Sequence, residues 1–258
     1  MDETDTGARR AIVTGADSGI GRATAVALAE SGYDVGITWH QDRDGAADTA
    51  AEVEGHGRRA LVERLDLADP AAAAAAIGAL VDGLGGLDAL VNNAGTTKFV
   101  KHADLEGLSA ADYERILGIN LVGPFQMVRA CRDALKASRG AVVNVSSVAA
   151  ARGTGSSIAY AASKSALNTM TQSLARALGP EIRVNSVAPG FVRTPWQEAQ
   201  GKDVTDETER KFAAAAPLAK PVDAADVADA VAWLIEGARS TTGVTILVDC
   251  GIHLATAR

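Results

Sequence analysis

The chain has 258 residues, of which 47% are hydrophobic and 4% aromatic, and its formal net charge at pH 7 is −7. A chain of this length can bury a full core as one domain, and its acidic balance, without any basic run, argues against a protein that binds nucleic acid. Two cysteines are too few for a disulfide framework, and four scattered histidines offer no ligand spacing, so we expect a reducing compartment and no metal.

Short apolar runs alternate along the chain with patterns typical of amphipathic helices. Pro70 begins one helix, and Ser109 is a good N-cap for a long helix that extends to about Lys136. Pro124 lies inside that helix and should disturb its hydrogen bonds near Asn120. Strands are predicted at residues 11–14, 35–38, 60–65, 87–91, 141–143, 182–187 and 245–248, further helices at 44–56 and 223–235, and an irregular polar segment at 194–220.

Seven strands that alternate with helices predict an α/β fold, a Rossmann-type doubly wound parallel sheet with helices on both faces. We find no linker and no repeat, so residues 1–258 are interpreted as a single domain in which 194–220 form a lid. In such a sheet ligands bind beyond the carboxyl ends of the strands. Five polar or turn residues lie just past the carboxyl ends of predicted strands and should therefore meet on one rim: Gly15, Asp66, Asn92, Ser147 and Pro189.

The first strand ends in a glycine-rich turn, and a helical pattern starts at once. Gly15 permits a tight turn, Gly19 lets the backbone approach a pyrophosphate, and Gly21 allows close packing of helix on strand. The spacing Gly-x3-Gly-x-Gly differs from the standard dinucleotide fingerprint, and a glycine-rich turn can be only a turn. The strand before it and the helix after it nevertheless favour nucleotide binding.

A second candidate site lies between residues 144 and 164. Tyr160 and Lys164 are four residues apart and so share one face of a helix. The ammonium should lower the pKa of the phenol, which would make the pair an acid–base device. Ser147, at the exit of the fifth strand, could meet the pair from the other side of a cleft. A Tyr and a Lys at this spacing also occur by chance on solvated faces, and a serine after a strand is ordinary turn chemistry.

Together these features resemble the short-chain dehydrogenase/reductase family over nearly the whole chain. Residues 14–21 match the family's cofactor turn, and residues 92–95 match its strand-stabilising Asn-Asn-Ala-Gly motif. Ser147 lies thirteen residues before Tyr160, as the family's catalytic serine does, and Tyr160-x3-Lys164 matches its base motif. Asn120 falls at its helix-kink asparagine, and Pro189, Gly190 and Thr194 match the segment beside the nicotinamide.

The resemblance implies an NAD(P)-dependent oxidoreductase that acts on CH–OH and C=O groups, with four catalytic residues. Tyr160 would donate or accept the hydroxyl proton, and Lys164 would lower its pKa and hold the nicotinamide ribose. Ser147 would bond the carbonyl oxygen. Asn120 would anchor a water that links Lys164 to solvent, although it could simply bond to backbone. Ser146 is the fallback for Ser147, and its side chain should point to the opposite face.

The resemblance also implies a cofactor site formed by the rim and the two motifs. Its expected residues are Gly15, Asp17, Ser18, Gly19, Ile20, Gly21, Thr38, His40, Asp66, Leu67, Asn93, Ala94, Gly95, Tyr160, Lys164, Pro189, Gly190, Val192 and Thr194.

The choice between NADP(H) and NAD(H) depends on the end of the second strand. A carboxylate there would bond the ribose 2′-hydroxyl of NAD. No acid stands at Thr38, while its hydroxyl, the His40 imidazole and Arg43 could accept the 2′-phosphate, so NADP(H) is favoured. Asp42 could instead bend back to serve NAD. Asp66 is expected to receive the adenine amino group, with a cap on the next helix as its alternative role.

The substrate is expected to be a small-molecule carbonyl or alcohol. Its pocket should involve residues 96–101, 148–152 and 194–212, and the candidate substrate residues are Thr97, Val148, Ala149 and Trp196. The layout resembles the bacterial branch that includes sugar and acetoin dehydrogenases and 3-oxoacyl-carrier-protein reductases.

Two alternatives remain open. In a 3-oxoacyl-carrier-protein reductase of fatty-acid type, a basic helix end at residues 129–139 would dock the acidic carrier, although such an end is usually a solvated face. A non-catalytic nucleotide-sensing protein could also keep this fold, but it would have no need of Ser147, Tyr160 and Lys164 together. The resemblance also implies a homotetramer or homodimer. Cys250 stands where the family usually has the first glycine of a pair, and it could affect the subunit contact.

Two features of the sequence bear on the cellular location of the protein. The first ten residues are polar, unlike a signal peptide, and no apolar run is long enough to span a bilayer. We therefore expect a cytoplasmic protein without a membrane partner.

Overall fold

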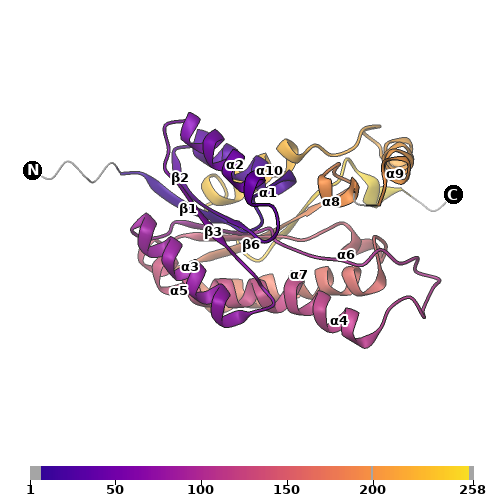
Figure 1. Ribbon diagram of the computed structural model, residues 1–258, viewed down its shortest axis with the longest axis horizontal. Coiled ribbons are helices and arrows are strands. Elements are labelled where there is room, and N and C mark those ends of the chain that lie inside the picture. Colours follow the sequence, from indigo (N-terminus) through magenta and orange to yellow (C-terminus); the bar gives the residue numbers. More distant parts are fainter. Residues whose placement is uncertain (1–6, 199, 256–258) are drawn as a thin grey trace, which may run out of the picture.

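A parallel sheet forms the centre of the molecule (Figure 1). The computed structural model describes residues 7–198 and 200–255. Within them the sheet has seven strands in the order β3-β2-β1-β4-β5-β6-β7, so the direction of winding reverses between β1 and β4. The predicted doubly wound sheet is confirmed. The strands are β1 (Arg9–Val13), β2 (Tyr33–Trp39), β3 (Ala60–Arg64), β4 (Ala89–Asn92), β5 (Ala141–Val145), β6 (Arg183–Pro189) and β7 (Thr245–Val248).

Helices cover both faces of the sheet (Figure 1). On one face lie α1 (Gly19–Glu30), α2 (Arg43–Gly55) and α10 (Ala224–Glu236), and on the other lie α3 (Pro70–Leu84), α5 (Gly123–Ser138) and α7 (Ile158–Leu178). The central strands serve both layers, because successive side chains point to opposite faces. Ala11 and Val13 pack in the core under α1, whereas Ile12 packs in the core under α3.

The long helix predicted from Ser109 is divided into three parts. Ser109 caps α4 (Ala110–Leu117) through a capping box with Asp112. A π-helical segment, η1 (Gly118–Val122), then leads into α5. Pro124 has no backbone N–H, so the regular ladder cannot continue past it, and the turn before it widens. The disturbance predicted near Asn120 is confirmed.

The segment 194–220 was predicted to be irregular, and this prediction is wrong. It contains α8 (Pro195–Glu198) and α9 (Lys202–Ala215), which are separated at Gly201, whose φ is 99°. The polar residues of α9 pair along the helix: Lys202 with Asp206 at 2.7 Å and Lys211 with Glu207 at 3.2 Å. Its polarity therefore reflects an exposed helix rather than a loop.

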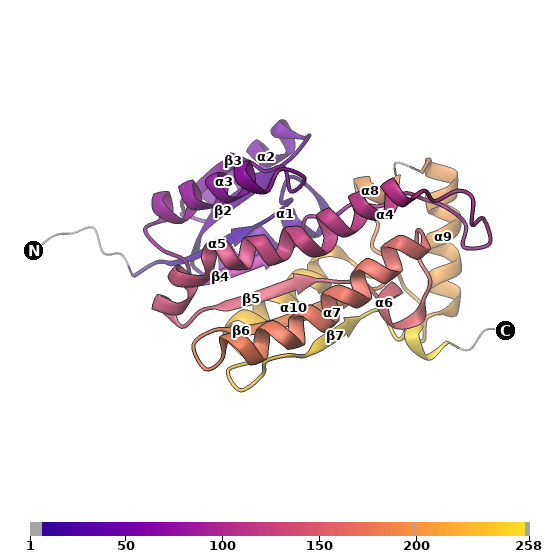
Figure 2. The same cartoon turned by 90° about the horizontal axis from the view of Figure 1, so that it is seen from below.

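Four further helices gather at the carboxyl end of the sheet. These are α4, α8 and α9 together with α6 (Ala149–Arg152), and Figures 1 and 2 both show the four helices at the same end of the molecule. The last element, η2 (Ile252–Leu254), follows β7 at this end. The fold thus places four helices around the carboxyl ends of the strands.

Candidate active site

A cleft of about 760 Å³ lies beyond the carboxyl ends of the strands, a size typical of small-molecule sites. Most of the site residues expected from the sequence line it: Gly15, Asp17, Ser18, Gly19, Ile20, Thr38, His40, Asn93, Ala94, Gly95, Ser147, Val148, Ala149, Tyr160, Lys164, Pro189, Gly190, Val192, Thr194 and Trp196. Five expected residues do not: Gly21, Asp66, Leu67, Thr97 and Asn120.

The glycine turn after β1 leaves no room for side chains at its glycine positions. Gly15 and Gly19 have φ values of 62° and 53°, in the left-handed region that favours glycine. A Cβ at Gly21 would lie 2.1 Å from the Gly15 carbonyl oxygen. Gly21 is therefore a packing residue behind the cleft, which agrees with the close helix–strand packing predicted for it.

The turns after β1 and β4 are tied to each other across the point where the sheet reverses. The Thr14 hydroxyl oxygen accepts from the backbone N–H groups of Asn93 and Ala94, each at 3.0 Å. The Asn93 side-chain amide donates to the Thr14 and Gly15 carbonyls at 3.0 and 2.8 Å. These four bonds hold the Asn-Asn-Ala-Gly motif against the glycine turn.

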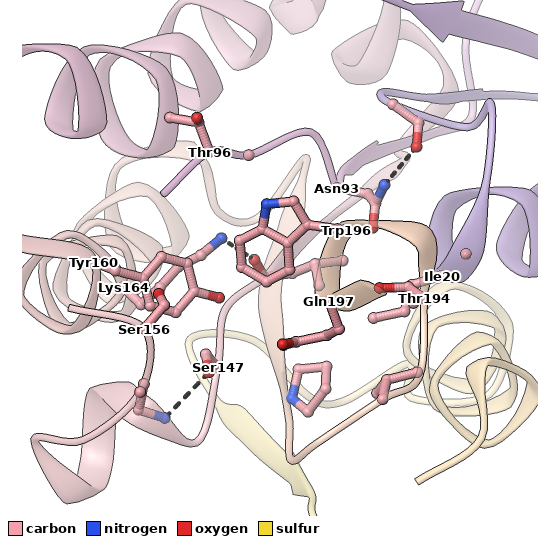
Figure 3. Close-up of a pocket in the computed structure, with 18 of the residues that line it drawn as sticks. Ile20, Asn93, Thr96, Ser147, Ser156, Tyr160, Lys164, Thr194, Trp196 and Gln197 are labelled. Carbon is pink, nitrogen blue, oxygen red and sulfur yellow. Dashed lines mark hydrogen bonds between the residues drawn. The ribbon is translucent and has the colours of Figure 1, made fainter. Parts of the chain in front are cut away.

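Ser147, Tyr160 and Lys164 face one space at the other end of the cleft (Figure 3). Ser147 follows β5, and its hydroxyl accepts from the Ala149 N–H at 3.1 Å. Tyr160 is held in the first turn of α7, which Ser157 caps by accepting from the Tyr160 N–H at 3.2 Å. The Lys164 ammonium donates to the Val145 carbonyl at 2.8 Å. The topology therefore places Ser147, which follows β5, in the same cleft as Tyr160 and Lys164 of α7, as predicted.

Burial controls the ionisation of the pair. It raises the pKa of Tyr160 to about 12, against a hydrogen bond with Ser147 that acts in the opposite direction. It lowers the pKa of Lys164 to about 8. The predicted lowering of the phenol pKa by the ammonium is wrong for this arrangement, because the phenolate would lose its hydration and the Lys164 Nζ lies 5.7 Å from the ring centroid.

Ser146 is not interchangeable with its neighbour. It borders the cleft, but its hydroxyl is buried and donates to the Lys164 carbonyl of α7 at 3.3 Å. This agrees with the prediction that its side chain points away from Ser147.

Asn120 lies behind Lys164 in η1 and is fully buried. Its oxygen accepts from the Thr96 N–H at 2.7 Å, and its amide donates to the Thr96 carbonyl at 2.9 Å and to the Ser163 hydroxyl at 3.0 Å. Asn120 therefore joins the loop after β4 to α7. The water relay expected of it stays a prediction.

The outer end of the cleft differs from the expectation in three residues. Thr38 is fully buried, and its hydroxyl oxygen accepts from the Gly15 N–H at 3.1 Å, so this hydroxyl supports the glycine turn. The Asp42 side chain caps α2 by accepting from the Gly45 N–H at 2.9 Å and is already engaged. Leu67 packs its side chain into the core beside α5.

Asp66 lies outside the lining of the cleft but close to it. Its carboxylate accepts from the Ala68 N–H at 2.9 Å and lies 3.5 Å from the His40 imidazole. The cap alternative for this residue is wrong, because Asp69 caps α3 through Ala71 and Ala72.

An aromatic cover lies over Tyr160. The Trp196 ring of α8 is 5.6 Å from the Tyr160 ring and 5.8 Å from the Phe99 ring, both centroid to centroid (Figure 3). Thr97 remains outside the lining but bonds the Ser156 hydroxyl at 2.6 Å.

Sequence reasoning missed several lining residues, among them Ser156, Phe191 and Ile252. Ile252 follows the last strand, and the rule that sites lie past carboxyl ends of strands could have found it. Phe191, which packs against Phe212 at 6.2 Å, lies within the motif at 189–194. Ser156 carried no local signal.

Comparison with known proteins agrees with this geometry. A family model described as enoyl-(acyl carrier protein) reductase matches residues 15–253. A Streptomyces violaceoruber protein that carries the name of a ketoacyl reductase of the granaticin polyketide synthase is 40% identical over 245 residues, which cover 95% of this chain and 96% of that protein. The chain belongs to the short-chain dehydrogenase/reductase family, and it is an oxidoreductase that acts on CH–OH and C=O groups.

Two solved structures of this family are informative. The acetoin dehydrogenase YohF from Salmonella typhimurium is 36% identical, with a TM-score of 0.85 and coverage of 96% of this chain and 98% of that one. A blue fluorescent protein from a metagenomic library, in complex with NADPH, is 35% identical, with a TM-score of 0.84 and coverage of 95% and 97%.

Two features are absent from the described residues, 7–198 and 200–255. No cluster of three or more His, Cys, Asp or Glu side chains could hold a metal ion. No helix is both long and apolar enough to cross a membrane.

Proposed function

We propose that this short-chain dehydrogenase/reductase transfers a hydride between NADP(H) and a small carbonyl or secondary alcohol, with Tyr160 as general acid and base. The observation that carries the proposal is one continuous cleft with the glycine turn at one end and Ser147, Tyr160 and Lys164 at the other. The side-chain-free surface at Gly15 and Gly19 fits a pyrophosphate. The dinucleotide, when bound, supplies or accepts the hydride.

The protein's own groups then manage the oxygen and its proton. Ser147 donates a hydrogen bond to the carbonyl oxygen, where charge develops during reduction. Tyr160 is a neutral phenol near pH 7, since burial raises its pKa to about 12, and it can therefore give its proton to that oxygen. Lys164 lies beside the ring with its ammonium 2.8 Å from the Val145 carbonyl, and holds the cofactor ribose.

The preference for NADP(H) rests on the end of β2. Asp42, the acid nearest to that end in sequence, is engaged as a cap of α2 and does not compete for a ribose hydroxyl. His40 lines the cleft there, and Arg43 begins α2 with an exposed side chain. The NADPH complex of a related structure supports the same choice.

Ketoacyl reduction is the second candidate, favoured by the name of the Streptomyces relative. The predicted carrier-docking cluster gives it little support. Arg132 pairs with Asp133 at 2.9 Å and Lys136 with Glu181 at 3.5 Å. This end of α5 leads into the amino end of β5, whereas the catalytic residues lie beyond its carboxyl end.

We also infer a cytoplasmic homotetramer or homodimer. Phe125 on α5 is 43% exposed and Trp233 on α10 is 51% exposed, and the two helices cover opposite faces of the sheet. An exposed aromatic side chain on each face could anchor one of the two contacts that a tetramer needs. Both cysteines are free, as in a reducing compartment.

The substitution Tyr160→Phe tests the function against a non-catalytic nucleotide sensor. It removes only the phenolic oxygen, so we expect reduction of acetoin or a similar ketone to fall about 100-fold or more, while NADPH binding stays within about 2-fold. Turnover and fluorescence titrations with NADPH and NADH measure both quantities. Near-normal activity of the variant would refute the role of Tyr160, and tighter binding of NADH would refute the coenzyme preference.

A further inference from the structure

Arg152 lies at the substrate end of the cleft without an ionic partner. It is the last residue of α6, it is among the residues that line the cleft, and it is exposed. No residue in the described part of the chain pairs with its guanidinium. By contrast, Arg193, also near the lid, contacts Glu198, Asp206 and Glu209.

The described residues that line the cleft place no carboxylate at the end where Arg152 lies. Among these described lining residues the only carboxylate is Asp17, which lies in the glycine turn at the cofactor end. The substrate end instead offers neutral polar groups on Thr154, Ser156 and Gln197. A cationic pocket in a chain with a net charge of −7 is therefore a local feature that would concentrate anions.

The distance between this cation and the reacting centre is set by a rigid segment. The Ala150 N–H donates to the Ser147 carbonyl at 3.0 Å, and the Arg152 N–H donates to the Val148 carbonyl at 3.1 Å. The Ser165 hydroxyl of α7 donates to the Ala150 carbonyl at 2.8 Å, which anchors α6. Five residues of helix span roughly 7 to 8 Å, so the Arg152 side chain can reach a group several bonds away from a carbonyl bound at Ser147.

We propose that the substrate is a carbonyl compound with an anionic group, a carboxylate or a phosphate, and that Arg152 binds this group. The inference rests on the proposed function and names the substrate class of the same site. By binding the anionic group at one end of the substrate, Arg152 sets the position of the carbonyl at the other end relative to Ser147 and Tyr160. The planar guanidinium suits bidentate contact with either anion.

The test compares anionic ketones with neutral analogues of matched shape. We would measure kcat and KM for 3-oxobutanoate, 4-oxopentanoate and 5-oxohexanoate, each against its methyl ester. A second arm compares acetoacetyl thioesters of pantetheine and phosphopantetheine, which distinguishes a small oxo acid from a phosphorylated arm. The variants are Arg152→Gln, Arg152→Lys as a conservative rescue, and Arg176→Gln as a control on an exposed arginine of α7 outside the cleft.

Arg152→Gln should lower kcat/KM for the preferred anionic substrate about 10- to 100-fold, mainly through KM, and leave its neutral analogue within about 2-fold. Arg152→Lys should recover part of the loss, and Arg176→Gln should change neither substrate. An equal loss on both members of a pair, or a wild-type enzyme that does not prefer the anion, overturns the inference.

Binding to the Tyr160→Phe variant separates this inference from the proposed function. Calorimetric titration of that variant with 4-oxopentanoate and its ester, with and without Arg152→Gln, needs no turnover. Selective loss of acid binding supports Arg152 even if the assignment of Tyr160 fails. Equal binding of acid and ester to both proteins refutes Arg152 even if the carbonyl reductase assignment holds.

Discussion

At the scale of single residues, burial decides the ionisation of the pair proposed to be catalytic, Tyr160 and Lys164. Tyr160 and Lys164 are 9% and 4% exposed. Burial disfavours the charged form of both groups. It therefore raises the pKa of Tyr160, which favours the neutral phenol, and lowers the pKa of Lys164, which favours the neutral amine. The i,i+4 spacing predicted that these two side chains share a face, but it contained no information about how much water reaches them.

The buried amine should give a pH dependence of stability. The pKa of Lys164 is about 8 in the folded state against 10.5 as the ordinary value, so between these values the unfolded chain binds more protons and stability rises with pH. Relative to Lys164→Met, wild-type unfolding free energy should rise by about 2 to 3 kcal/mol between pH 7.5 and 10. Urea unfolding of both proteins measures it, and the contribution of Tyr160, which both chains contain, cancels in the difference. A difference that stays constant with pH would mean that Lys164 keeps its ordinary pKa.

At the scale of elements, one arginine side chain bridges α8 and α9, the helices of the proposed lid. The Arg193 guanidinium contacts Glu198 of α8 at 3.3 Å and Glu209 of α9 at 2.7 Å, and it also bonds Asp206 of α9. Arg193 is adjacent to Thr194, and α8 carries Trp196 over the catalytic tyrosine. The position of the substrate cover thus depends on an exposed ionic cluster.

Arg193→Gln should loosen the lid without changing the catalytic groups. We expect KM to rise about 3- to 10-fold, with a smaller effect on kcat, and amide exchange in α8 and α9 to become faster. Salt should reduce the difference from wild type, because exposed ion pairs are screened. Arg210→Gln is the matched control, since Arg210 pairs with Glu207 within α9 alone. An equal effect of both substitutions would show that general charge, rather than the clamp, controls the lid.

At the scale of the whole molecule, the reversal of the sheet between β1 and β4 creates the site. Two turns diverge there and are tied by Thr14 and Asn93, and α1 packs closely enough that Gly21 has no space for a side chain. Cofactor binding and stability are therefore linked through the same contact.

Gly21→Ala should damage both properties. The new Cβ would lie 2.1 Å from the Gly15 carbonyl, so α1 must move, and we expect about 2 to 4 kcal/mol lower unfolding free energy and weaker NADPH binding. Gly78→Ala, in α3 with no neighbour within 4 Å, should instead stabilise by about 0.5 to 1 kcal/mol and leave binding unchanged. Denaturation and fluorescence titration of both variants measure this, and unchanged NADPH binding by Gly21→Ala would contradict it.

The sequence by itself determined the strands, the glycine turn and the shared face of Tyr160 and Lys164. These features depend on local periodicity and backbone freedom, which neighbours in the chain specify. Only the tertiary structure decided that Thr38 supports the turn, that residues 194–220 contain helices, and that the phenol pKa rises. Each of these depends on groups distant in sequence, because desolvation and hydrogen-bond partners follow from packing. Arg152 belongs to the same class: its position five residues after Ser147 is local, but its lack of a partner in the cleft is a property of the folded chain.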